Sequence, residues 1–130
     1  MSSGIDIRAL RRSDIASFRE AAIASWLDAY DGILRQDIVD DVGPMMDRAI
    51  ARRFDKFTVA IVDGEVAGYF SLGDTPEELN YLWHLYVAPK FQRRGVGGAL
   101  HAAALAAIRA RGCRDARLDV AMLNEKALGF

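Results

Sequence analysis

The chain has little cysteine, little net charge and no long apolar run. Its single cysteine, Cys113, excludes an internal disulfide framework and leaves too little sulfur for a thiolate metal site. A net charge of −1 over 130 residues lacks the basic field with which proteins attract nucleic acid or anionic lipid. No apolar run approaches the ~18 residues of a membrane span, and the N-terminus shows no secretory signal pattern. These absences predict a cytoplasmic protein with no metal and no nucleic-acid or membrane partner.

The remaining composition is ordinary. Apolar residues make up 52% of the chain and charged residues 27%, which are values typical of globular proteins. The length suits one domain, residues 1–130, in which residues 1–4 form a flexible tail.

Apolar spacing along the chain predicts the element order β-α-α-β-β-β-α-β-α. Strands are expected at 5–10, 57–62, 66–72, 79–87 and 116–120, and helices near 15–29, from 44, from 97 to 111 and from 124. Asp63-Gly64 is typical of a hairpin turn in which both central residues have positive φ. A meander followed by a strand–helix–strand crossover predicts an α/β fold with a mixed, mostly antiparallel sheet flanked by helices.

One junction between a strand and a helix is rich in glycine and arginine. Gly95, Gly97 and Gly98 allow a ligand to approach the backbone closely, and Arg93 and Arg94 add charged donors. A helix N-terminus with its unpaired N–H groups binds anions readily, so the junction suits a pyrophosphate. The alternative is that the glycines only turn the chain and the arginines are solvated. Neither a dinucleotide fingerprint nor a P-loop is present.

The same stretch resembles the GNAT superfamily of N-acetyltransferases. Residues 92–97, Gln-Arg-Arg-Gly-Val-Gly, match the coenzyme A signature Gln/Arg-x-x-Gly-x-Gly/Ala, and residues 85–89, Leu-Tyr-Val-Ala-Pro, match the usual lead-in. Farther on, Asn124-x-x-Ala127-x-x-Phe130 resembles the second motif of the family. Two motifs in the right order are more specific than either motif alone.

The resemblance implies acetyl-CoA as the acetyl donor. The loop amides would cradle the pyrophosphate, the backbone of Leu85 and Val87 would pair with the pantetheine arm, and Asn124 would contact that arm. The implied contacts with the donor are Leu85, Tyr86, Val87, Gln92, Arg93, Arg94, Gly95, Val96, Gly97, Gly98, Asn124 and Ala127.

The implied reaction is direct attack of a primary amine of a small molecule or peptide on the thioester. An alkylammonium has a pKa of about 10.4, so a base must first remove a proton. Many members place a glutamate where this chain has Tyr81, which leaves Tyr81, His84 and Glu78 as catalytic candidates. Strand parity predicts that His84 faces away from Tyr81.

The acceptor side would be formed by aromatic residues. The residues expected to contact the acceptor are Trp26, Tyr30 and Trp83.

The family usually has a tyrosine directly after the position of Phe130 and adds further strands, which are missing here. Three explanations stay open: a fragment, a partner chain that supplies a strand in a homodimer paired through the exposed sheet edge, or a reduced variant. The functional prediction is an acetyl-CoA-dependent N-acetyltransferase. The alternative is a catalytically weak or inactive acyl-CoA-binding module, or a piece of a longer acetyltransferase.

Overall fold

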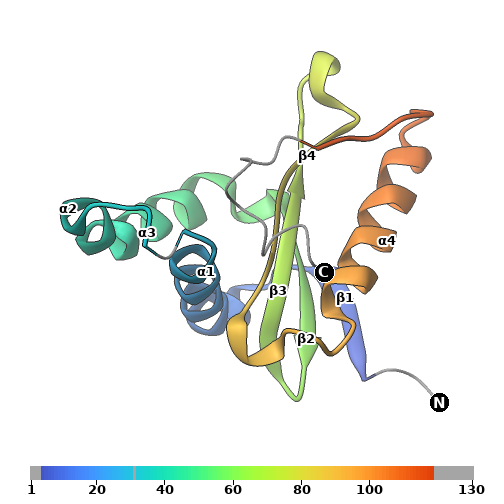
Figure 1. The fold of residues 1–130 in the computed structure, drawn as a ribbon. Helices are drawn as coiled ribbons and strands as arrows, with labels where there is room; N and C mark the ends of the chain where they lie inside the picture. The colour runs from blue at the N-terminus through green and yellow to red at the C-terminus, as the bar shows by residue number, and fades with distance from the viewer. Residues whose placement is uncertain (1–3, 31, 119–130) are drawn as a thin grey trace.

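The computed structural model describes residues 4–30 and 32–118. The strands and helices follow one another along the chain (Figure 1) as β1 (Ile5–Ala9), α1 (Ile15–Ala29), α2 (Gln36–Asp40), α3 (Val42–Arg53), β2 (Phe57–Val62), β3 (Glu65–Leu72), β4 (Tyr81–Val87), α4 (Val96–Ala110) and β5 (Arg117–Leu118). Short 3-10 turns lie at Arg12–Asp14, Phe54–Lys56, Pro76–Glu78 and Pro89–Phe91.

The strands form one sheet in the order β1-β2-β3-β4-β5. The pairs from β1 to β4 are antiparallel, and β5 is parallel to β4. The predicted mixed, mostly antiparallel sheet is therefore confirmed. Of the strand predicted at 116–120, the described residues hold Arg117–Leu118.

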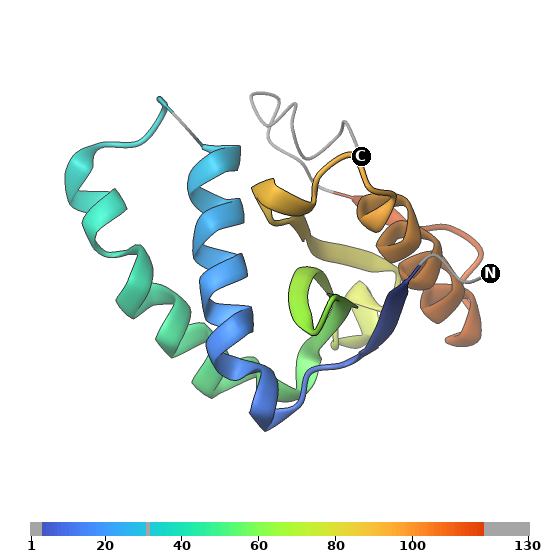
Figure 2. The ribbon, with the colours of Figure 1, turned by 90° about the horizontal axis from the view of Figure 1, so that it is seen from below.

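Helices cover both faces of this sheet. Helix α1 packs on β3 and β4 with α3 beside it, and α4 packs on the opposite face, as Figure 2 shows from below. On the α1 face, Phe18 is buried against the rings of Phe57 and Tyr69, with centroid distances of 4.8 and 4.9 Å. On the other face, α4 buries Leu100 and Ile108.

The segment between α1 and α3 differs from the predicted single helix that starts at residue 44. Helix α3 begins at Val42 rather than near Pro44, because proline is tolerated within the first turn of a helix. The short helix α2 precedes it. The segment's carboxylates are partly paired, since Asp37 lies 3.0 Å from Arg35 and Asp41 lies 3.2 Å from Arg48.

The hairpin turn between β2 and β3 is as predicted. Asp63 has φ 53° and Gly64 has φ 78°. An Asp-Gly pair adopts these angles at low cost, and the turn sets the register in which Val62 lies opposite Glu65.

Gly68 of β3 lies where a strand and a helix approach closely. A Cβ atom at this position would be 2.6 Å from the Tyr86 carbonyl oxygen and 2.9 Å from Cδ1 of Leu100. We expect Gly68→Ala to lower the free energy of unfolding by about 1–3 kcal/mol, because the packed core must shift. Urea denaturation measures the change. Gly98→Ala is the control, since a Cβ atom there meets nothing within 4 Å; equal stabilities of the two variants would contradict the prediction.

Candidate active site

The junction between β4 and α4 has an unusual backbone. Gly95, the N-cap of α4, has φ 83°, and Arg93 has φ 65°, although it is not glycine. Left-handed residues at alternating positions turn neighbouring N–H groups into an anion-binding concavity. The helical hydrogen bonds of α4 begin with the bond from the Ala99 N–H to the Gly95 carbonyl, which is 3.1 Å long. The amides just before Ala99 therefore belong to the first turn, whose N–H groups have no partner within the helix. The space around Gly98 is open.

The arginines of this loop differ in their contacts. Arg94 lies over the Phe91 ring, 5.3 Å from its centroid, and its guanidinium is 3.5 Å from a carboxylate oxygen of Asp63. Arg93 is exposed and forms no ion pair with any residue that the structure describes. Both guanidiniums lie at the surface, where an anion can reach them.

Gln92 connects the loop to its surroundings. Its Nε2 donates to a carboxylate oxygen of Asp28 at the end of α1, at 3.2 Å, and to the Val87 carbonyl, at 3.4 Å. The loop is thereby attached to both α1 and β4.

One edge of β4 is available beside the loop. The Ala88 N–H donates to the Ala67 carbonyl at 2.8 Å, so by alternation the backbone groups of Tyr86 point toward β3 and those of Leu85 and Val87 point away from it. In the described part of the chain, β5 pairs only with Tyr81 and Leu82. No strand within residues 4–30 and 32–118 therefore pairs with Leu85 and Val87 at this edge, as the predicted pantetheine contact requires, although the Val87 carbonyl accepts the bond from Gln92; Tyr86 faces β3 instead.

A β-bulge in β4 corrects the predicted side-chain parity. Ser71 pairs with His84, Leu72 pairs with Leu82, and the Gly73 N–H bonds to the Tyr81 carbonyl at 2.8 Å. Since residues 71 and 73 share a face of β3, His84 and Tyr81 also share a face. The expectation that His84 points away from Tyr81 was wrong, because the bulge adds a residue at Trp83 and shifts the alternation.

The bulge places two aromatic rings together at the start of β4. The rings of Tyr81 and Trp83 are stacked with centroids 4.6 Å apart, and the Arg117 guanidinium lies 5.1 Å from the centroid of Tyr81. Trp83 is 44% exposed, so this side chain can contact a ligand.

The other aromatic residues expected on the acceptor side form a second group, at the end of α1. The rings of Trp26 and Tyr30 are 5.0 Å apart, and the Tyr30 phenol also acts on the phenol of Tyr86. Tyr86 packs on Tyr69 with centroids 5.6 Å apart. Burial raises the pKa of the Tyr86 phenol far above its ordinary value, so this hydroxyl stays protonated.

His84 lies between these two aromatic groups along β4. Its Nδ1 is 2.6 Å from the hydroxyl of the fully buried Ser71. Burial first, and the positive charge of Arg53 second, lower the pKa of His84 below its ordinary 6.5. The imidazole is therefore neutral at pH 7 and is able to accept a proton.

Other predicted site residues lie elsewhere. Glu78 ends the turn Pro76–Glu78, where its carboxylate accepts a hydrogen bond from the Thr75 hydroxyl at 3.1 Å. Asn124 and Ala127 lie outside the described residues.

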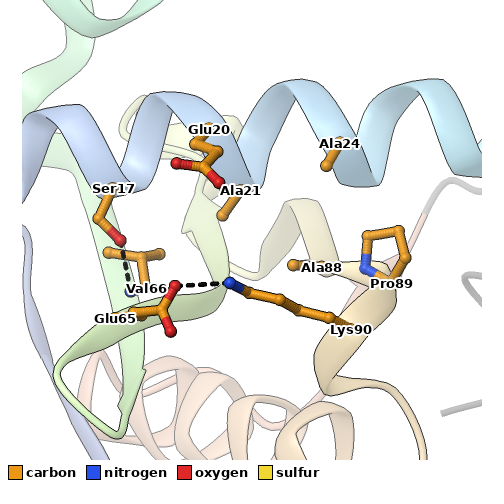
Figure 3. Close-up of a pocket in the computed structure, with 9 residues that line it drawn as sticks. All are labelled: Ser17, Glu20, Ala21, Ala24, Glu65, Val66, Ala88, Pro89 and Lys90. Atoms are coloured by element: carbon orange, nitrogen blue, oxygen red, sulfur yellow. Dashed lines mark hydrogen bonds and ion pairs between the residues drawn. The ribbon is translucent and has the colours of Figure 1, made fainter.

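A pocket of about 200 Å³ lies between α1, the start of β3 and the turn that leads into the loop (Figure 3). Lys90 reaches across it to Glu65, at 2.6 Å, and the Val66 N–H donates to the Ser17 hydroxyl at 2.8 Å. The sequence carried no signal for this pocket, because three distant segments form it. The pocket lies beside the loop, because Lys90, one of its lining residues, precedes Gln92 by two positions.

Within residues 4–30 and 32–118, no group of three His, Cys, Asp or Glu side chains could hold a metal ion. In the same ranges, no helix is long and apolar enough to cross a membrane.

A sequence model of the acetyltransferase (GNAT) family matches residues 15–130. The chain belongs to this family. It is therefore an acetyl-CoA-dependent N-acetyltransferase, as its sequence predicted. The loop suits this donor, since left-handed residues, open space and unpaired amides meet at the start of α4.

Known proteins similar to this GNAT chain include a curated relative and solved structures. The chain is 29% identical over 129 residues to aminoglycoside N(6')-acetyltransferase type 1 of Stenotrophomonas maltophilia, which covers 92% of this chain and 77% of the relative. PaiA N-acetyltransferase of Thermoplasma acidophilum, solved with coenzyme A, is 24% identical with a TM-score of 0.78, covering 100% of this chain and 86% of that one. A GNAT acetyltransferase of Brucella melitensis, solved with acetyl-CoA, is 24% identical with a TM-score of 0.64, covering 99% and 84%.

Proposed function

We propose that this acetyltransferase transfers the acetyl group of acetyl-CoA to the primary amine of a small molecule or peptide by direct attack. Residues 92–98 bind the pyrophosphate of the donor through their backbone amides, and Arg93 and Arg94 add charge. The backbone of Leu85 and Val87 holds the pantetheine arm at the open edge of β4.

One observation carries this proposal. The loop with left-handed Arg93 and Gly95 begins α4 directly after β4, whose edge at Leu85 and Val87 is covered by no strand in the described part of the chain. A loop suited to an anion thus adjoins a strand edge to which an extended arm can be added, which is the arrangement that a nucleotide with a long thioester arm requires.

His84 is our candidate for the base that removes the proton of the amine. Its neutral imidazole is held by Ser71. The tautomer in which Nδ1–H donates to the Ser71 hydroxyl leaves the Nε2 lone pair free to accept a proton. Tyr81 and Trp83 lie on the same side of β4 and form one wall of the acceptor site. Trp26 and Tyr30 form another wall.

The name of the curated relative points to amine acceptors among small molecules.

A second candidate function is a weak acyl-CoA-binding module, and one observation favours it. Tyr81, which stacks on Trp83 and contacts the Arg117 guanidinium, occupies the position at which many family members carry a glutamate.

Thiol release from acetyl-CoA distinguishes the two functions. The purified chain is incubated with a panel of aminoglycosides, diamines, amino acids and peptides, and free thiol and acetylated product are both measured. We expect release that depends on the amine and exceeds hydrolysis. Binding of acetyl-CoA without such release would overturn the proposed transfer and support the module.

A further inference from the structure

Arg53 is the one arginine of the described chain with a buried donor that has no partner. Its Nε is buried and forms no hydrogen bond. A buried donor without a partner is costly, which makes an unexplained one a sign of a missing ligand. The other arginines near the sheet have partners: Arg8 pairs with Asp14, Arg111 donates to the carbonyls of Gly73 and Leu79, and Arg117 donates to the Glu77 carbonyl.

The position of Arg53 brings it to the candidate catalytic face. It ends α3, one short turn before Phe57. Phe57, Ser71 and His84 are successive neighbours across β2, β3 and β4, and the rings of Phe57 and His84 are 6.5 Å apart. Arg53 also acts on His84 electrostatically. The charge of Arg53 is therefore close enough to the proposed base to act on it.

A positive charge at this place affects the choice of acceptor. It repels a substrate with several ammonium groups, and it favours the neutral form of a bound amine. It attracts an acceptor that carries an anionic group near its amine, and a guanidinium fork matches the two oxygens of a carboxylate.

We propose that Arg53 binds a carboxylate of the acceptor, so that the substrate is an amino acid or a similar amine that carries a carboxylate. The inference rests on the proposed function and narrows its acceptor class. Arg53 then determines specificity, while the acetyl donor is bound elsewhere, at the start of α4.

Matched acceptors test this role. Free amino acids and the corresponding amino-acid amides share a side chain and an amine but differ in the carboxylate. For the wild-type chain we expect kcat/KM to be at least about tenfold higher for the preferred acid than for its amide. At a pH well above 6.5, where His84 is neutral in both proteins, Arg53→Gln should lower kcat/KM for the acid by about tenfold to a hundredfold and change that for the amide much less. Arg53→Lys should recover part of the loss, because lysine keeps the charge but not the fork.

Arg52→Gln is the matched control, since it removes the same charge from an exposed neighbour on α3 and should leave the preference intact. Thermal unfolding without substrate separates binding from folding: Arg53→Gln should not lower Tm, because the Nε loses no hydrogen bond. A lower Tm with an unchanged preference would show a structural role and overturn the inference. If the wild-type chain acetylates the amides as fast as the matched acids, and Arg53→Gln lowers neither rate, the inference is overturned while the proposed function stands. Absence of turnover with every amine would overturn both the inference about Arg53 and the proposed function.

Discussion

Gly98→Glu is expected to abolish measurable binding of coenzyme A. The position has open space around it, so a larger side chain can be accommodated without disturbing the fold. The added carboxylate would face the place proposed for the pyrophosphate, and like charges in direct contact cost several kcal/mol. We expect the dissociation constant to rise by about a hundredfold or more, which isothermal titration calorimetry measures.

Two matched variants isolate the effect of the charge at this position. Ala106→Glu adds the same carboxylate to an exposed position farther along α4 and should leave the affinity unchanged. Gly98→Gln has nearly the same size without the charge and should weaken binding less than Gly98→Glu. Gly97 is a poorer choice for this test, because it is buried and its replacement could disturb folding. Full affinity in Gly98→Glu would show that the pyrophosphate lies elsewhere.

The features that sequence predicted well are those that depend on neighbouring residues. The conformation at Asp63-Gly64 follows from two adjacent residues, and the loop follows from one contiguous run, 92–97, at the start of a helix. The mixed sheet followed from the spacing of apolar residues and from the crossover helix. In each case, the residues that determine the structure are close together in the chain.

The features that sequence missed depend on contacts between distant segments. The bulge at Trp83 arises from the pairing of β3 with β4, and a single added residue was enough to reverse the predicted side of His84. The charge of Arg53 acts on His84 although the two residues lie on elements that are far apart in the chain. No pattern in one segment could show that the phenols of Tyr30 and Tyr86 interact.

His84→Gln is expected to lower kcat by about a hundredfold to ten-thousandfold, because a positioned general base contributes that much. The KM for acetyl-CoA should change little, since the loop at the start of α4 is untouched. Steady-state kinetics with a saturating acceptor measures both values. His101→Gln is the control, as His101 lies on α4. A kcat within a few-fold of the wild type would exclude His84 as the base and return attention to Tyr81 and Glu78.

The pH dependence gives a second measure of His84. Burial and Arg53 lower its pKa below 6.5, so the neutral form that accepts a proton persists to lower pH than for an exposed histidine. The wild-type kcat should therefore fall only below pH 6.5, and Arg53→Gln should move this fall to higher pH, because a nearby positive charge is removed. The unfolded chain binds the proton more tightly than the folded chain, so the free energy of unfolding should also decrease as the pH falls below 6.5. His84→Gln should weaken that decrease, and an identical pH dependence of stability in both proteins would show that His84 is not held neutral by the fold.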